Sequence, residues 1–167
     1  MIRSRRRLLL VGGALLISLV CAAHAQPGGS ASKVTWTVQG DTLAVGTTGT
    51  VTLQASVAEG WKMYAPDSPP PTVGVAVTDL EANRSGVVLG TDSLSYTGGA
   101  TAYDPNFGKD VHFFSGEARL RLPIAISADA RSGTHALQGT LRFMVCTEEI
   151  CLPPATEQFN TTVVATD

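Results

Sequence analysis

The chain has 167 residues, a formal net charge of −2 and three cysteines. Charge close to balance, with no basic cluster after the first few residues, argues against nucleic acid and anionic membrane as partners. The length suits one domain that buries a substantial core. After the N-terminal region no apolar run approaches the roughly 20 residues of a spanning helix, so the mature chain is predicted to have no transmembrane span.

The first 25 residues have the features of an export signal. Four arginines precede an apolar run over residues 8–20, and the motif Ala23-His24-Ala25 fits a signal-peptidase site. Cleavage after Ala25 would remove Cys21 and release the chain into the periplasm. The arginine-rich start also resembles a twin-arginine signal, but an ordinary secretory signal is favoured. Residues 26–33 are small and polar and are predicted to form a flexible leader.

From Val34 onward the apolar residues alternate with polar ones, which is the period of a half-buried β-strand. The pattern is clearest over residues 34–38, 51–57, 73–77, 118–126 and 141–145. Glycine and proline separate these runs, and no window has a convincing helical period. Many short strands with turn signals between them predict one all-β domain over residues 34–167, either a sandwich or a barrel.

Two segments interrupt the alternation and are predicted to be loops. Residues 66–71 are rich in proline and are interpreted as a rigid connector. Residues 96–109 are mostly polar but carry Phe107 beside Gly108. From these residues alone, Phe107 is either an anchor in the core or the covering group of a mobile lid, because loop residues carry function only in some cases.

The two cysteines that survive cleavage, Cys146 and Cys151, are separated by four residues and flanked by strand-like segments. Residues 141–145 and 156–164 therefore predict a hairpin with the cysteines opposite each other at its mouth. Opposed residues in an antiparallel pair lie about 4.5 to 5.5 Å apart at Cα, within the range that a disulfide accepts. The prolines after Cys151 cannot donate to a ladder, so the bond is expected at a sheet edge near the surface.

Three segments together resemble the N-terminal periplasmic domain of the DsbD thiol:disulfide interchange proteins. They are Cys146 to Thr156, with its short acidic loop and Cys-Leu-Pro-Pro-x-Thr ending, Gly60-Trp61-Lys62-Met63-Tyr64, and Asp104-Pro105-Asn106-Phe107-Gly108-Lys109. The resemblance covers nearly all of the mature chain. It implies an immunoglobulin-like β-sandwich.

The resemblance also implies roles for individual residues. Cys146 and Cys151 match the redox pair, and by strand position Cys146 would form the mixed disulfide with partners. Tyr64 matches an aromatic residue near the cysteines. The residues that fall in the cap loop, which shields the pair, are Asp104, Asn106, Phe107 and Gly108.

In the family, a thioredoxin-like protein donates electrons to this domain. The acceptor is a periplasmic disulfide isomerase or a thioredoxin-like protein of cytochrome maturation. No cofactor is predicted, because the sequence has no haem-attachment motif and no phosphate-binding glycine loop. The transmembrane and thioredoxin-like domains of the family are missing from this sequence, so the donor is expected to be a separate protein.

Glu148 and Glu149 place negative charge between the cysteines, and the loop contains no lysine, arginine or histidine. Nearby anions disfavour a thiolate, so the pKa of each cysteine is expected to be raised. This predicts a relay whose thiols react only after a partner has docked.

Two other interpretations stay open. The pair is also consistent with a structural disulfide in a non-enzymatic interaction module, since exported proteins use such bonds for stability. A short loop weakens this interpretation, because stabilisation grows with loop length. Met63 and Met144 with the cysteines would suit a copper(I)-handling domain, although core methionines are favoured and no metal site is predicted.

Overall fold

The structure is a computed structural model that describes residues 29–82, 87–89 and 94–167; the predicted export signal lies outside these ranges. In chain order the elements are a 3-10 turn, η1 (Ser30–Lys33), and the strands β1 (Val34–Gln39), β2 (Thr42–Ala44), β3 (Thr48–Val57), β4 (Lys62–Tyr64), β5 (Ala76–Ala82), β6 (Val87–Leu89), β7 (Ser95–Thr97), β8 (Ala100–Asp104), β9 (Lys109–Phe114), β10 (Glu117–Ile126), β11 (Gly133–Phe143), β12 (Val145–Cys146) and β13 (Ala155–Thr166). Within the described ranges, no helix is long and apolar enough to cross a membrane.

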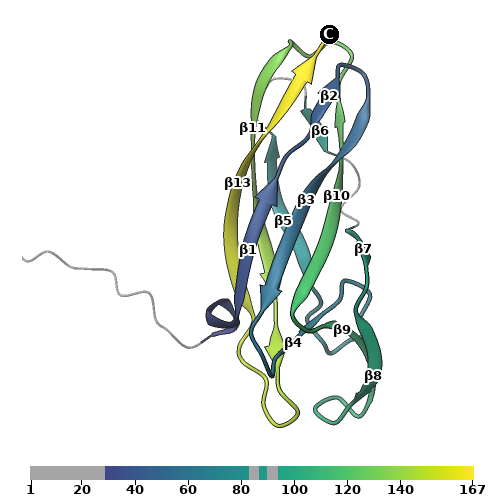
Figure 1. The fold of residues 1–167 in the computed structure, drawn as a ribbon, viewed down its shortest axis with the longest axis vertical. Helices are drawn as coiled ribbons and strands as arrows, with labels where there is room; N and C mark the ends of the chain where they lie inside the picture. Colours follow the sequence, from purple (N-terminus) through teal and green to yellow (C-terminus); the bar gives the residue numbers. More distant parts are fainter. Residues whose placement is uncertain (1–28, 83–86, 90–93) are drawn as a thin grey trace, which may run out of the picture.

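Two long sheets run along the axis of the molecule and enclose the main core (Figure 1). One has the order β1-β3-β10-β6, with β7 also pairing with β10, and the other has the order β2-β13-β11-β5. The predicted alternation holds in β10, where Leu120, Leu122 and Ile124 are buried and Arg119 and Arg121 are exposed. Side chains on one face of each strand fill the space between the sheets. The predicted immunoglobulin-like β-sandwich is confirmed.

A third, smaller sheet lies at the end of the sandwich away from the C-terminus (Figure 1) and has the order β12-β4-β9-β8. It corrects the loop predicted over residues 96–109, because β8 and β9 form an antiparallel hairpin there. The strands were missed because β8 is an edge strand whose first four residues are all exposed, so it lacks alternating polarity. Gly98 and Gly99, with φ of 85° and 87°, make the turn that leads into it.

The predicted cysteine hairpin is confirmed in β11 and β13, which pair antiparallel from Gly133↔Ala165 to Phe143↔Ala155. One detail differs from the prediction. After Phe143 the chain leaves the long sheet, and Val145 and Cys146 pair with Met63 and Lys62 of β4 instead. The segment that carries the first cysteine therefore belongs to the end sheet.

Part of the leader predicted over residues 26–33 is described by the structure, from residue 29 onward. Residues 30–33 form η1, and the Ser30 side chain is fully buried. Its hydroxyl donates to the carbonyl of Pro153 at 2.8 Å and accepts from the amide of Val145 at 3.1 Å. A small polar residue suits this place because it satisfies two backbone groups beside the cysteines.

Candidate functional site

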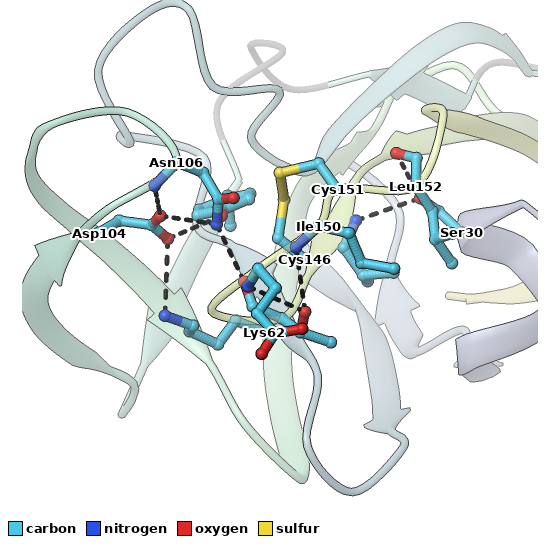
Figure 2. The surroundings of a disulfide bond; sticks show 12 residues. Ser30, Lys62, Asp104, Asn106, Cys146, Ile150, Cys151 and Leu152 are labelled. Atoms are coloured by element: carbon cyan, nitrogen blue, oxygen red, sulfur yellow. Dashed lines mark hydrogen bonds and ion pairs between the residues drawn. A yellow bond between two sulfur atoms is a disulfide. The ribbon is translucent and has the colours of Figure 1, made fainter.

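The centre of the site is a disulfide between Cys146 and Cys151 (Figure 2). The two residues are antiparallel bridge partners, and their Cα atoms are 4.0 Å apart, slightly closer than the sequence predicted. They differ in exposure: Cys146 is fully buried, whereas Cys151 is exposed. The bond thus has one side in the protein and one side toward solvent.

The backbone between the cysteines is held by hydrogen bonds within the loop. The amide of Thr147 donates to the carbonyl of Ile150 at 2.8 Å, and the Thr147 hydroxyl accepts from the amides of Glu149 and Ile150. Just outside the cysteine loop, the amide of Leu152 donates to the carbonyl of Val145 at 3.0 Å. These bonds close a tight loop that leaves Ile150 54% exposed next to Cys151.

The predicted cap residues are in the turn that joins β8 to β9, and we call residues 104–108 the cap turn. Asp104 is fully buried at the end of β8, and its carboxylate accepts from the Asn106 amide at 2.9 Å. The Asn106 side chain also donates to the Thr147 carbonyl at 2.9 Å, which joins the cap turn to the cysteine loop (Figure 2). Gly108 has a φ of 65°, which a residue with a side chain adopts only at a cost.

Phe107 packs into a small apolar cluster that contains Cys146. The buried members of this cluster are Tyr64, Val111, Met144 and Cys146, with Val73, Phe107 and Phe113 against them. The Phe107 ring meets the Tyr64 ring edge to face, with 5.4 Å between centroids. The cap turn thus places Phe107 against the cluster that contains Cys146, and Cys151 is not a member of this cluster.

Tyr64 belongs to the same cluster as Cys146, and it connects this cluster to Asp104. Its hydroxyl donates to the Asp104 carboxylate at 2.8 Å. Burial, followed by this hydrogen bond to a carboxylate, raises the pKa of Tyr64 well above its ordinary range, so the hydroxyl stays protonated and keeps donating. For Asp104, burial acts to raise the pKa, but hydrogen bonds from Tyr64 and Asn106 and the charge of Lys62 outweigh it and lower the pKa.

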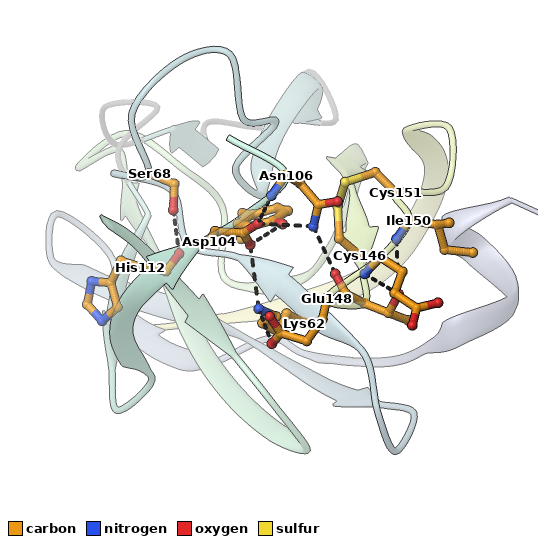
Figure 3. A network of polar contacts seen from close by, with 12 residues as sticks. Lys62, Ser68, Asp104, Asn106, His112, Cys146, Glu148, Ile150 and Cys151 are labelled. Atoms are coloured by element: carbon orange, nitrogen blue, oxygen red, sulfur yellow. Dashed lines mark hydrogen bonds and ion pairs between the residues drawn. A yellow bond between two sulfur atoms is a disulfide. The ribbon is translucent and has the colours of Figure 1, made fainter. Parts of the chain in front are cut away.

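Lys62 is the residue that sequence reasoning missed. Its ammonium lies 2.8 Å from a Glu148 carboxylate oxygen and 3.6 Å from Asp104, although only 10% of its side chain is exposed (Figure 3). It also lies 5.1 Å from the centre of the Phe113 ring. The cysteine loop itself has no cation, as the sequence indicated, but β4 brings one beside it. Lys62 lies in one of the three segments that carry the family resemblance, but its strand pairing with Cys146 is not visible in one sequence.

Of the two acidic residues in the cysteine loop, only Glu148 has this ion pair. Glu148 also lines an open pocket of about 570 Å³ together with Lys62, Trp61 and Phe113. Glu149 is exposed in the same loop. The two carboxylates that the sequence treated as equivalent therefore have different surroundings.

The methionines considered for a copper(I) set come from different segments. Met144 belongs to the cluster around Cys146 and lies between β11 and β12, whereas Met63 of β4 is fully buried in the core of the sandwich. Met63 stands opposite Val145, one position away from the cysteine. In the described part of the chain, no three His, Cys, Asp or Glu side chains are grouped to hold a metal ion.

Comparison with solved structures finds domains with a similar fold. The reduced N-terminal domain of DsbD from Neisseria meningitidis matches at 18% identity and a TM-score of 0.48, over 82% of this chain and 88% of that chain. The N-terminal periplasmic domain of ScsB from Proteus mirabilis matches at 15% identity and a TM-score of 0.50. That match covers 76% of this chain and 44% of the ScsB chain. No curated protein matches the sequence.

The family comparison covers most of the chain. The family described as "Thiol:disulfide interchange protein DsbD, N-terminal" matches residues 27–163, a range that contains both cysteines, the cap turn and Lys62. Its thiol:disulfide interchange role agrees with the disulfide that the structure contains. The chain therefore belongs to the family of DsbD N-terminal domains.

Proposed function

We propose that this chain is a periplasmic thiol:disulfide relay, which takes reducing equivalents from a thioredoxin-like donor and passes them to a periplasmic acceptor through Cys146 and Cys151. Membership of the DsbD N-terminal family supports the interchange chemistry. The export signal expected in the sequence and the periplasmic ScsB domain support the compartment. The acceptor is expected to be a disulfide isomerase or a thioredoxin-like protein of cytochrome maturation.

The observation that carries the proposal is the unequal exposure of the two cysteines. A thiolate nucleophile must approach the sulfur it attacks, so access decides which cysteine reacts with partners. Cys151 is exposed, and Cys146 is buried in a cluster against which Phe107 of the cap turn packs. This reverses the role expected from strand position: Cys151 forms the mixed disulfide and Cys146 is the resolving partner.

The proposed reaction moves two electrons in two steps. A donor thiolate attacks the sulfur of Cys151, the bond to Cys146 breaks, and its electron pair leaves on the Cys146 sulfur, which takes up a proton. The second donor thiolate attacks the donor sulfur in the mixed disulfide and displaces Cys151, which also takes up a proton. The donor leaves as a disulfide. The same steps in reverse order reduce the acceptor, with Cys151 attacking and Cys146 resolving.

The surface beside Cys151 has a contact suited to a partner. Ile150 is one of two large hydrophobic residues among the described residues that are markedly exposed, and it is the neighbour of Cys151 in the chain. Ile150 therefore offers a docked partner one apolar contact beside the reacting sulfur. Glu148 and Glu149 add negative charge around it.

A trapping experiment tests which cysteine engages partners. Cys146→Ser leaves only Cys151, and we expect it to accumulate mixed disulfides with purified thioredoxin-like proteins, because the bond cannot be resolved from within. Cys151→Ser is the matched control and should accumulate few. Equal trapping by both variants, or trapping by Cys151→Ser alone, would remove the assignment to Cys151.

A redox titration separates the relay from the structural-disulfide alternative. Equilibration with dithiothreitol should give a potential above about −270 mV, in the range of thiol-exchange proteins, whereas structural bonds typically lie below about −300 mV. A value in the structural range would favour a non-enzymatic module. Binding of copper(I) by the reduced protein tests the third alternative.

A further inference from the structure

Lys62 is a buried, charged residue of the end sheet and is not part of the apolar core of the sandwich. It is 8% exposed, and its strand partner in β4–β12 pairing is Cys146. A buried ammonium is costly unless it is paired with anions. Its two anions come from different segments: Asp104 from the cap turn and Glu148 from the cysteine loop (Figure 3).

The two ion pairs differ in how easily they can break. Asp104 is fully buried and also accepts hydrogen bonds from Tyr64 and Asn106, so its place is fixed by several contacts. The Glu148 side chain is 71% exposed. Exposed ion pairs are weak, so the Glu148 contact is the one that water or a docking protein would release first.

Cys146 lies between the segments that Lys62 joins. The cysteine loop begins directly after it, and the cap turn packs Phe107 into its cluster. A second link, from the Asn106 side chain to the Thr147 carbonyl, connects the same two segments. Separating them would uncover Cys146, whereas Cys151 is exposed already.

We propose that Lys62 is a positioning residue that holds the cysteine loop against the cap turn through Glu148, and so keeps Cys146 covered while Cys151 stays accessible. The proposal rests on the assignment of Cys151 to partner exchange. Lys62 thereby makes the two thiols unequal and directs reagents and partners to Cys151. Release of Glu148 during docking would free Cys146 to resolve the mixed disulfide.

Site-resolved alkylation of the fully reduced protein tests this directly. Iodoacetamide is uncharged, and mass spectrometry of the labelled peptides gives a separate rate for each cysteine. The alkylation rate of each cysteine rises with pH and then levels off. The plateau rate reports how accessible the sulfur is, and the midpoint pH reports the pKa of the thiol. The charged or ionisable groups near Lys62 are Asp104, Glu148, Tyr64 and, along the same pocket, Glu59.

The variants are Glu148→Gln and Lys62→Met. Each should raise the plateau rate at Cys146 by about threefold, which corresponds to the loss of one weak ion pair, and leave the plateau at Cys151 unchanged. The double variant should be no faster than the faster single variant, because both changes break the same contact. Glu148→Gln acts at an exposed residue, so it keeps the test valid if Lys62→Met fails to fold.

Two matched controls isolate the ion pair from net charge. Glu149→Gln removes the same charge from the same loop, and Lys33→Met removes a cation that lies over the Trp61 ring at 5.2 Å. Neither should change the plateau at Cys146. Equal effects of Glu148→Gln and Glu149→Gln, or opposite plateau shifts in Glu148→Gln and Lys62→Met, would overturn the proposal in favour of simple electrostatics.

The outcome does not depend on the relay being correct. The alkylation rates require no partner protein. A redox potential in the range of structural disulfides would contradict the relay proposal, and the role of Lys62 in covering Cys146 would still be judged from the alkylation rates. Equal plateau rates at the two cysteines of the wild-type protein would end the Lys62 proposal, even with a relay-range potential.

Discussion

The sandwich and the small sheet at its end are held together by different interactions. Between the long sheets the contacts are almost all apolar, with Leu53, Leu120 and Phe143 fully buried. In the end sheet, a small apolar cluster is accompanied by buried polar groups: Asp104 and Lys62 are connected through hydrogen bonds and ion pairs.

The contrast separates stability from reactivity. Apolar burial contributes roughly 25 cal/mol per Å² and has no directional requirement. Many apolar sequences can therefore form the core of the sandwich, but a loss of buried volume lowers its stability. Polar links in the end sheet are directional and individually weak, so they set which atoms are accessible more than whether the domain folds. Changes in the sandwich should therefore alter stability, and changes in the end sheet should alter thiol chemistry.

The largest effect is expected in the sandwich. Leu120→Ala should lower the free energy of unfolding by about 2 to 5 kcal/mol, because it leaves a cavity in a fully buried place. Alkylation of the reduced cysteines well below the melting temperature should not change. Its exposed neighbour in the strand supplies the control, since Arg119→Ala should stay within about 0.5 kcal/mol of wild type. Urea unfolding measures both, and faster alkylation in Leu120→Ala would contradict the separation.

Reduction of the disulfide should have a smaller effect. The bond joins residues only five positions apart, so its loss should cost about 2 kcal/mol or less, by the dependence of loop entropy on length. Unfolding curves of the oxidised and reduced protein give the difference. Collapse of the fold on reduction would make the end sheet a stabilising element and would favour the structural-disulfide interpretation.

Asp104→Asn should have an effect that depends on pH. The folded-state pKa of Asp104 is lowered, so its charged form stabilises the folded protein above the ordinary pKa of about 3.9, and this contribution is lost as the pH falls through the folded value. At pH 7 the variant should be less stable by about 1 to 2 kcal/mol, from weakened hydrogen bonds and the lost ion pair. The difference from wild type should shrink below about pH 4. A constant difference from pH 7 to pH 3 would show that the charge contributes nothing.

The same Asp104→Asn variant should also alkylate faster, because it removes negative charge near the thiols and raises the thiolate fraction. This increase should fade at high pH, where the thiols are already ionised. A difference that persists there would assign the effect to access instead.

Phe107→Ala is expected to change stability least and access most. The ring is half-buried at the edge of the Cys146 cluster, so its removal should cost less than about 1 kcal/mol, well under the 3 to 5 kcal/mol of a core phenylalanine. Alkylation at Cys146 should become several-fold faster, and this should persist at high pH. If the variant is strongly destabilised and labelling is unchanged, Phe107 is a core anchor and not a cover.

Most of the sandwich was predictable because its information is local. Alternation with period two places one set of side chains inside, and this identified the buried faces of β1, β3, β10 and β11. The cysteine spacing predicted both the hairpin and the bond. The β8–β9 hairpin was not predictable in this way, since an exposed edge strand has no apolar face to alternate with a polar one.

The site itself depended on contacts between segments far apart in the chain. Sequence alone identified the cysteine pair, the acidic loop between them and the segment of the cap turn, because each is a short contiguous motif. Only the tertiary structure decided that Cys146 is buried and Cys151 exposed, since β12 leaves the long sheet to pair with β4. The same pairing brings Lys62 close to Asp104 and Glu148. The strength of a Coulomb interaction depends on distance in space and not on separation in sequence, so this site could not be found from the sequence.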